Sequence, residues 1–222
     1  MDHWPNNLQL PGGALNLYSN LKFLHKPTMP IFPTEKWLNY QFVNNTKISP
    51  SVYNVYKPIE HSIAAKTIVC SDYSKGYLNN TFAKFKSKYL FVDTKYGQIS
   101  KNLLTDSEVV ILKATTTDLI EDSLLKTFDY SIITNQQENI LVYKSSKIIF
   151  EIPVPKVFPL CTIGAGDLFL AVLAFHIHIS DSDDFTHSLY SAVKNATTLA
   201  AKSVELPYTS NLNLLKENNV YN

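Results

Sequence analysis

The run Gly164-Ala165-Gly166-Asp167 joins small residues to a carboxylate, directly before the apolar residues 168–174. Small residues let a backbone approach a ligand closely. The first amides of a helix have no internal partner, so a helix that begins here can bind an anion, and its dipole adds to the attraction. Asp167, in the first turn, can accept a proton from an attacking hydroxyl. The pattern therefore predicts a site for the charge that develops on a transferring phosphoryl group.

The same run also has a purely structural interpretation. Gly164 and Gly166 can form a tight loop, and a carboxylate such as that of Asp167 is favoured at a helix start by the dipole alone. A single Gly-x-Gly does not decide between the two interpretations. The elements that surround the run must therefore be considered.

Composition restricts the class of protein. The chain has 222 residues, of which 45% are hydrophobic and 18% are charged, with a formal net charge of +1. These values predict a globular protein with a sizeable core and no global field for nucleic acid or an anionic membrane. The first residues carry no signal-peptide pattern, and no apolar run approaches the length of a membrane span. We therefore expect a cytoplasmic enzyme or binding protein that forms one domain over residues 1–222.

Alternating strands and helices are predicted after an irregular arm over residues 1–10. Helical spacing is found in residues 14–24, 80–87, 117–126, 165–176 and 185–203. Short β-branched or aromatic runs predict strands at 66–70, 89–93, 108–112, 130–134, 140–143 and 147–150, and one or two more between 36 and 48. The alternation indicates an α/β protein with a mainly parallel sheet, whose last two strands form a hairpin around Ser145-Ser146.

Polar residues follow the predicted strands at the point where each strand ends. Because parallel strands end at one edge of a sheet, and ligands of such sheets bind there, these residues predict a binding site. They are Ser71-Asp72, Asp93-Thr94-Lys95, residues 113–117 and Thr134-Asn135.

The order Thr162-x-Gly-Ala-Gly-Asp167 followed by an apolar helix resembles the second signature of the ribokinase-like (PfkB) carbohydrate kinases. The resemblance implies that Asp167 is the catalytic base and that the amides of Gly164, Ala165 and Gly166 form an anion hole. It implies a three-layer α/β/α fold over one kinase domain, and ATP with Mg²⁺ as cofactors.

Further segments support the resemblance on the sugar side. Residues 11–16 resemble a Gly-Gly-Ala-x-Asn sugar-binding turn, which implies sugar contacts from Gly12, Gly13 and Asn16. Residues 71–76, Ser-Asp-Tyr-Ser-Lys-Gly, look like a run of the heptose-7-phosphate kinases. Residues 92–95, Val-Asp-Thr-Lys, are similar to an Asp-Pro-Lys run of the same kinases. Substrate contacts are thereby implied for Asp72, Lys75 and Lys95. The two lysines would bind a sugar phosphate as point charges, and their alternative interpretation is that of ordinary solvent-facing lysines.

On the nucleotide side, the resemblance implies that Thr134, Asn135, Thr162 and Asn195 bind the cofactor. Residues 115–118 align with the Asn-x-x-Glu motif that organises magnesium, so Thr115 and Asp118 would hold the ion through water. The family's aspartate before the signature is Cys161 in this chain.

The resemblance begins at the Gly-Gly turn, which implies that the first strand and the β-lid of the family are missing and that residues 25–50 are a compressed remnant of the substrate side. Two functions fit this pattern. One is ATP-dependent phosphorylation of a sugar or sugar phosphate. The other is a non-catalytic kinase fold that binds a nucleotide or a partner protein. An exposed edge strand would also allow a homodimer or a separate completing chain.

Overall fold

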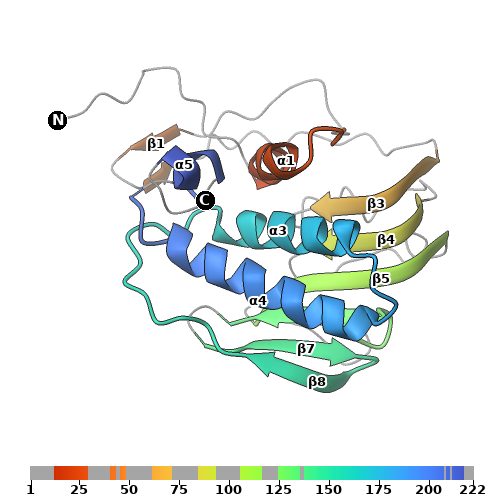
Figure 1. Cartoon of the computed structure of the whole chain (residues 1–222). Helices are drawn as coiled ribbons and strands as arrows, with labels where there is room; N and C mark the ends of the chain where they lie inside the picture. The colour runs from red at the N-terminus through yellow and green to blue at the C-terminus, as the bar shows by residue number, and fades with distance from the viewer. Residues whose placement is uncertain are drawn as a thin grey trace.

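The computed structural model describes residues 13–29, 41–43, 46–48, 62–71, 85–93, 106–116, 125–135, 138–207, 209–210 and 212–217. The centre of this part of the chain is a six-stranded sheet with the order β3-β4-β5-β6-β7-β8 (Figure 1). Strands β3 to β6 are parallel to one another. Strand β7 pairs antiparallel with β6 on one side and with β8 on the other. The strands are β3 (Ile63–Ser71), β4 (Phe85–Asp93), β5 (Asp106–Thr115), β6 (Tyr130–Thr134), β7 (Ile140–Lys144) and β8 (Lys147–Ile152). The predicted α/β class with a mainly parallel sheet is confirmed.

The central strands owe their position to continuous apolar runs. In β4, residues from Tyr89 to Asp93 are all buried, and in β5 the same holds from Val110 to Ala114. A strand that is buried on consecutive residues is covered on both faces, as parallel strands are. Most residues of these buried runs are apolar. Asp93 and Lys113 are exceptions, because they are charged and buried.

Helices α1, α3 and α4 lie together on one face of the sheet, with α3 between the other two (Figure 1). Residues 167–174 of α3 are consecutively buried, which fits a helix enclosed by the sheet and two neighbours. By contrast, α4 buries one stripe that includes Leu189, Val193 and Ala196. The helices are α1 (Gly13–Leu24), α3 (Ala165–Ile179), α4 (Phe185–Ser203) and the short α5 (Leu212–Glu217).

Alternate residues of the strands build a separate core on each face. Phe91, Ile111 and Ile132 pack with α3 and α4. Leu90 and Leu112 point to the opposite face, where they pack with Leu125 and Phe128 and others. None of the described helices combines the length and apolarity needed to cross a bilayer.

Within the described residues, most predicted elements match the structure, and one segment was assigned to the wrong type. The helix predicted over 80–87 is wrong at its end, because β4 begins at Phe85. Phe85 and Ser87 are buried while Lys86 and Lys88 are exposed, and this period of two is that of a strand with one covered face. Most of the helix predicted over 117–126 lies outside the described residues.

The sequence predicted one or two strands between 36 and 48, and the structure has two there, the antiparallel pair β1 (Gln41–Val43) and β2 (Thr46–Ile48). The hairpin around Ser145-Ser146 is also confirmed, and both serines have positive φ. The predicted arm at 1–10 and most of the region predicted as a compressed remnant lie outside the described residues.

Candidate active site

Gly164 caps the N-terminus of α3 in the left-handed conformation, with φ 79°. A Cβ at this position would lie 2.6 Å from Nδ2 of Asn16 and 2.8 Å from Cγ2 of Thr209. Both the backbone conformation and the space therefore require glycine. The turn brings the start of α3, at the carboxyl ends of the parallel strands, against α1 and the segment before α5.

Asp167 lies in the first turn of α3 with its side chain almost fully buried, at 3% exposure. Nδ2 of Asn16, in α1, donates to its Oδ2 at 3.2 Å and to the carbonyl oxygen of Ser210 at 3.1 Å. Both acceptors face the same nitrogen, so the amide orientation follows from its surroundings. The structure thus joins two of the predicted site residues, Asn16 and Asp167, in one hydrogen bond.

The segment before α5 keeps Asn16 in place. Ser210 donates its backbone N–H to the carbonyl oxygen of Ile163 at 2.8 Å, and its hydroxyl accepts from Ser203 at 2.7 Å. One α1 turn further on, the buried Asn20 accepts from the backbone N–H of Leu212 at 2.8 Å. Through these contacts, the segment that contains Ser210 and Leu212 holds both α1 and the loop before α3. The sequence patterns gave no sign of Ser210, because its role depends on contacts far along the chain.

The backbone amides at the start of α3 differ in their hydrogen-bond partners. Ala165 donates to the carbonyl oxygen of Thr162 at 3.3 Å, and Leu168 donates to that of Gly164 at 2.9 Å. The amide of Gly166 lies between these two, in the helix turn whose N–H groups point beyond the helix end, and is suited to donate to an anion.

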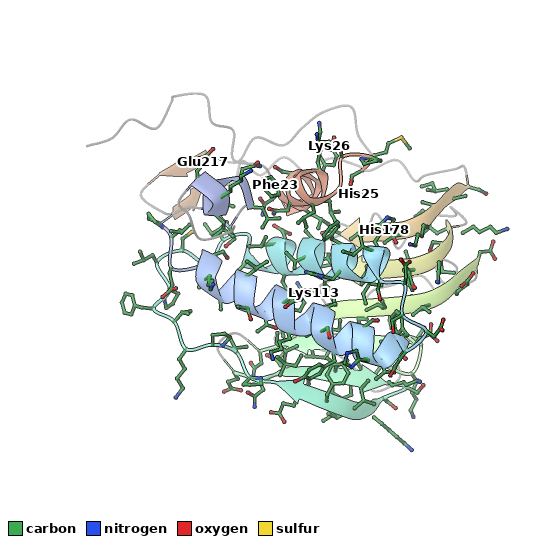
Figure 2. All side chains as sticks on the ribbon, viewed as in Figure 1. Phe23, His25, Lys26, Lys113, His178 and Glu217 are labelled. Atoms are coloured by element: carbon green, nitrogen blue, oxygen red, sulfur yellow. The ribbon has the colours of Figure 1, made fainter. Side chains whose placement is uncertain are left out.

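A buried ion pair that the sequence reasoning missed lies beneath this loop. Nζ of Lys113, at the end of β5, is 3.1 Å from Oδ1 of Asp93 on β4, and both side chains are less than a tenth exposed. A Cβ on Gly166 would come within 3.1 Å of the Lys113 ammonium. The signal that could have revealed the pair is a lysine that interrupts the apolar run of β5, beside a strand that ends in aspartate. Lys113 is labelled in Figure 2.

The predicted nucleotide-binding residues are spread over three elements. Thr134 ends β6 and donates to the carbonyl oxygen of Ala114 at 3.2 Å, and Asn135 accepts from the Thr116 hydroxyl at 2.8 Å. These contacts tie together the ends of β5 and β6. Thr162 precedes the glycine loop with an exposed side chain, and Asn195 is exposed on α4.

Thr115, a predicted magnesium residue, is half-buried at the end of β5, in register with Thr134. Within the described residues no three histidine, cysteine or acidic side chains gather as a metal cluster.

Of the remaining predicted site residues, Gly13 begins α1. The predicted residues Gly12, Asp72, Lys75, Lys95 and Asp118 lie outside the described residues.

One curated protein is similar to this chain in sequence. The chain is 28% identical over 174 residues to the bifunctional protein HldE of Helicobacter hepaticus, a match that covers 68% of this chain and 36% of that protein. The chain thus spans about a third of the length of this curated relative. No protein-family model matches.

Two solved structures similar to this chain are described by their own names. Aminoimidazole riboside kinase from Salmonella enterica has a TM-score of 0.45 at 21% identity, covering 58% of this chain and 51% of that one. Ribokinase from Thermotoga maritima has a TM-score of 0.49 at 14% identity, covering 66% and 52%. The predicted resemblance to ribokinase-like carbohydrate kinases is confirmed as a similarity.

Proposed function

We propose that this chain transfers the γ-phosphoryl group of ATP to a hydroxyl of a sugar or sugar phosphate, heptose-7-phosphate being the first candidate. The observation that carries the proposal is the Asp167 carboxylate, which Asn16 orients at the start of α3, within a loop that Gly164 turns through a left-handed conformation. A carboxylate beside first-turn amides supplies the two functions that this reaction needs, a proton acceptor and an anion site.

In the proposed reaction, the substrate hydroxyl gives its proton to Asp167 while its oxygen forms a bond to the γ-phosphorus. The bond between that phosphorus and the β–γ bridging oxygen breaks, and ADP leaves. Enzymes that catalyse such transfers act mainly by positioning and electrostatic stabilisation. Asn16 serves here as the residue that positions the carboxylate, in addition to its predicted place on the sugar side.

The anion hole is assigned to the loop from Gly164 to Asp167. Ala165 donates to the Thr162 carbonyl oxygen and so closes the loop, and the amide of Gly166 is assigned as a donor to the phosphoryl oxygens. Gly164 contributes the left-handed turn, and Ala165 contributes the hydrogen bond that closes the loop. Removing one donor of such a hole typically costs about 100- to 1,000-fold in turnover.

Cofactor and substrate contacts complete the proposal. Thr134, Asn135, Thr162 and Asn195 are assigned to the nucleotide, and Gly12, Gly13, Asp72, Lys75 and Lys95 to the sugar or its phosphate. Thr115 lies at the end of β5, in register with Thr134, and a hydroxyl oxygen is a ligand type that suits Mg²⁺. Thr115 and Asp118 would hold the ion through water, and Mg²⁺ when bound neutralises phosphate charge.

The test is Mg²⁺-dependent ATP turnover against a panel of sugars and sugar phosphates, with Asp167→Asn and Asp183→Asn compared. Asparagine at 167 keeps an oxygen that can accept from Asn16, but it cannot take up the proton. We expect turnover to fall at least about 1,000-fold in Asp167→Asn, while ADP binding stays within a factor of a few. Asp183 is exposed, so Asp183→Asn makes the same charge change without an effect. Undiminished turnover in Asp167→Asn would refute the proposal.

The second candidate is a fold that binds a nucleotide without transfer. The burial of Asp167, at 3% exposure, favours it, because a buried and hydrogen-bonded carboxylate can serve the helix start alone. This candidate predicts ADP binding by the wild-type chain, no turnover with any substrate of the panel, and a loss of stability as the main effect of Asp167→Asn.

A further inference from the structure

The Lys113–Asp93 pair stands directly beneath the proposed anion hole. Lys113 and Asp93 are register partners on the adjacent parallel strands β5 and β4. They follow Ile111 and Phe91 by two residues and so point to the same face of the sheet, the face covered by α3. Both therefore project from the carboxyl ends of their strands toward the first turn of α3.

Stability alone gives little reason for an ion pair in this position. Replacing a buried ion pair with apolar residues of similar volume is often neutral or stabilising, because desolvation offsets the attraction between the charges. Neighbouring positions of both strands are occupied by buried apolar residues. An apolar pair here would therefore extend the core, whereas the actual pair places a cation at the site.

The surroundings of the ammonium favour an anionic ligand. Gly166 lacks the Cβ that would lie 3.1 Å from Nζ, so the ammonium can approach the loop backbone. The helix N-terminus there carries positive partial charge, and a cation beside it is unfavourable until an anion faces both. An ammonium has three N–H donors. Within the described part of the chain, Asp93 is the acceptor that Lys113 reaches, at 3.1 Å.

We propose that Lys113 is a further catalytic residue, which donates to an oxygen of the transferring phosphoryl group, and that Asp93 is a positioning residue for the ammonium. This inference rests on the proposed phosphoryl transfer. In the same step the substrate oxygen bonds to the γ-phosphorus, the bond to ADP breaks, and the proton moves to Asp167. Lys113 remains an ammonium throughout and stabilises the charge spread over the phosphoryl oxygens, together with the amide of Gly166.

The experiment compares Lys113→Met, Lys113→Arg and the double variant Lys113→Met/Asp93→Asn with the wild-type chain. Lys147→Met is the matched control, because Lys147 is exposed at the hairpin, which joins the last two strands at the opposite end of the sheet. Lys113→Met leaves Asp93 buried without its partner, so this variant is expected to lose stability. The double variant removes both charges and is expected to recover it, as measured by the urea unfolding midpoint.

We expect kcat to fall about 100-fold or more in Lys113→Met and to remain low in the double variant, with the KM for the sugar changed less than about threefold. Lys113→Arg should retain more of the activity than Lys113→Met. A second readout needs no turnover, namely the affinity for inorganic phosphate by calorimetry. It should weaken at least about tenfold in both variants that lack the ammonium, and stay unchanged in Lys147→Met.

A double variant that is stable and turns over at the wild-type rate would overturn the inference. The Lys113–Asp93 pair of the wild-type chain would then have a structural role only. Unchanged phosphate affinity in that variant would overturn it as well. These outcomes are separable from failure of the proposed function. If Asp167→Asn abolishes turnover while the Lys113 variants do not, only the inference about Lys113 fails. If the wild-type chain transfers no phosphoryl group to any acceptor, both fail.

Discussion

The side-chain amide of Asn16 donates to the Asp167 carboxylate, although the two residues are 151 positions apart. The contact links α1 to the first turn of α3, and the same amide nitrogen also binds the carbonyl oxygen of Ser210. One buried side chain thus connects three segments at the candidate site. Its removal should disturb both the fold and the orientation of the proposed base.

Asn16→Leu should lower the free energy of unfolding by about 1–3 kcal/mol, because two buried acceptors would lose their donor. Asn16→Asp should cost more at neutral pH, since a second carboxylate would face that of Asp167 in a buried site. Urea unfolding of both variants at pH 7 and pH 4 measures the effect. The deficit of Asn16→Asp should shrink at pH 4, where carboxyl groups begin to take up protons. Equal stability of the wild type and Asn16→Leu would show that the contact contributes nothing.

The two glycines of the loop should respond differently to alanine. Gly164→Ala places a side chain at φ 79° and within 2.6 Å of Asn16, so we expect a loss of more than about 2 kcal/mol of stability. Gly166 lies within the helix, where alanine is favoured by about 1 kcal/mol, and its added Cβ meets the movable end of Lys113. Gly166→Ala should therefore fold with nearly wild-type stability.

Activity provides the second half of this comparison. Because the Cβ of Gly166→Ala would displace the ammonium of Lys113, turnover should fall at least about tenfold while the unfolding midpoint stays close to that of the wild type. Thermal unfolding and turnover measured on the same preparations decide the matter. A Gly164→Ala variant as stable as the wild type would contradict the left-handed cap.

The sequence was sufficient to predict the sheet, the helix after the glycine loop and the place of Asp167. Apolar runs in the central strands are continuous, and α3 and α4 carry strong helical patterns, so local signals and tertiary packing agree there. The end of the segment predicted as helical over 80–87 failed for a local reason. Alternating lysines can be placed on a helix or on one face of a strand, and only the burial of Phe85 and Ser87 decides for the strand.

The contacts that complete the site were not predictable in the same way. Asn16 meets Ser210 across 194 positions, and no pattern near either residue announces the pairing. Lys113 is different, because a charged residue in a buried apolar run is itself a signal of a buried partner or ligand. That signal was not used, although Asp93, which ends the neighbouring strand, would have been the first candidate for the partner. Topology then supplied the register that places the two side chains opposite each other.

The β7–β8 turn offers a stabilising substitution away from the site. Ser145 and Ser146 adopt φ values of 48° and 66°. A two-residue hairpin turn with positive φ at both positions strongly favours Asn-Gly. Ser145→Asn/Ser146→Gly should therefore raise the free energy of unfolding by about 0.5–1 kcal/mol with turnover unchanged. Chemical denaturation tests this, and a destabilised variant would show that the serines make compensating contacts.

His178, near the end of α3, should make stability fall in mild acid. Burial lowers its pKa below the usual 6.5, and Lys66 and His25 lower it further by repulsion. His178 and His25 are labelled in Figure 2, and their rings lie 4.8 Å apart. Nδ1 of His178 is 3.0 Å from the Thr67 hydroxyl. The unfolded chain therefore takes up this proton at a higher pH than the folded chain. Stability is fully present above about pH 6.5 and decreases as the pH falls from there toward the folded-state pKa.

Replacing His178 with glutamine should make the decline of stability between pH 7 and pH 5 shallower. The decline should not vanish, because burial also lowers the pKa of His176. His187→Gln is the matched control, since the His187 side chain is exposed on α4. Urea midpoints measured at half-unit pH intervals give the two slopes. If His178→Gln and His187→Gln follow the wild-type curve equally, the acid sensitivity of the fold arises from other groups, and the His25–His178 contact does not oppose protonation.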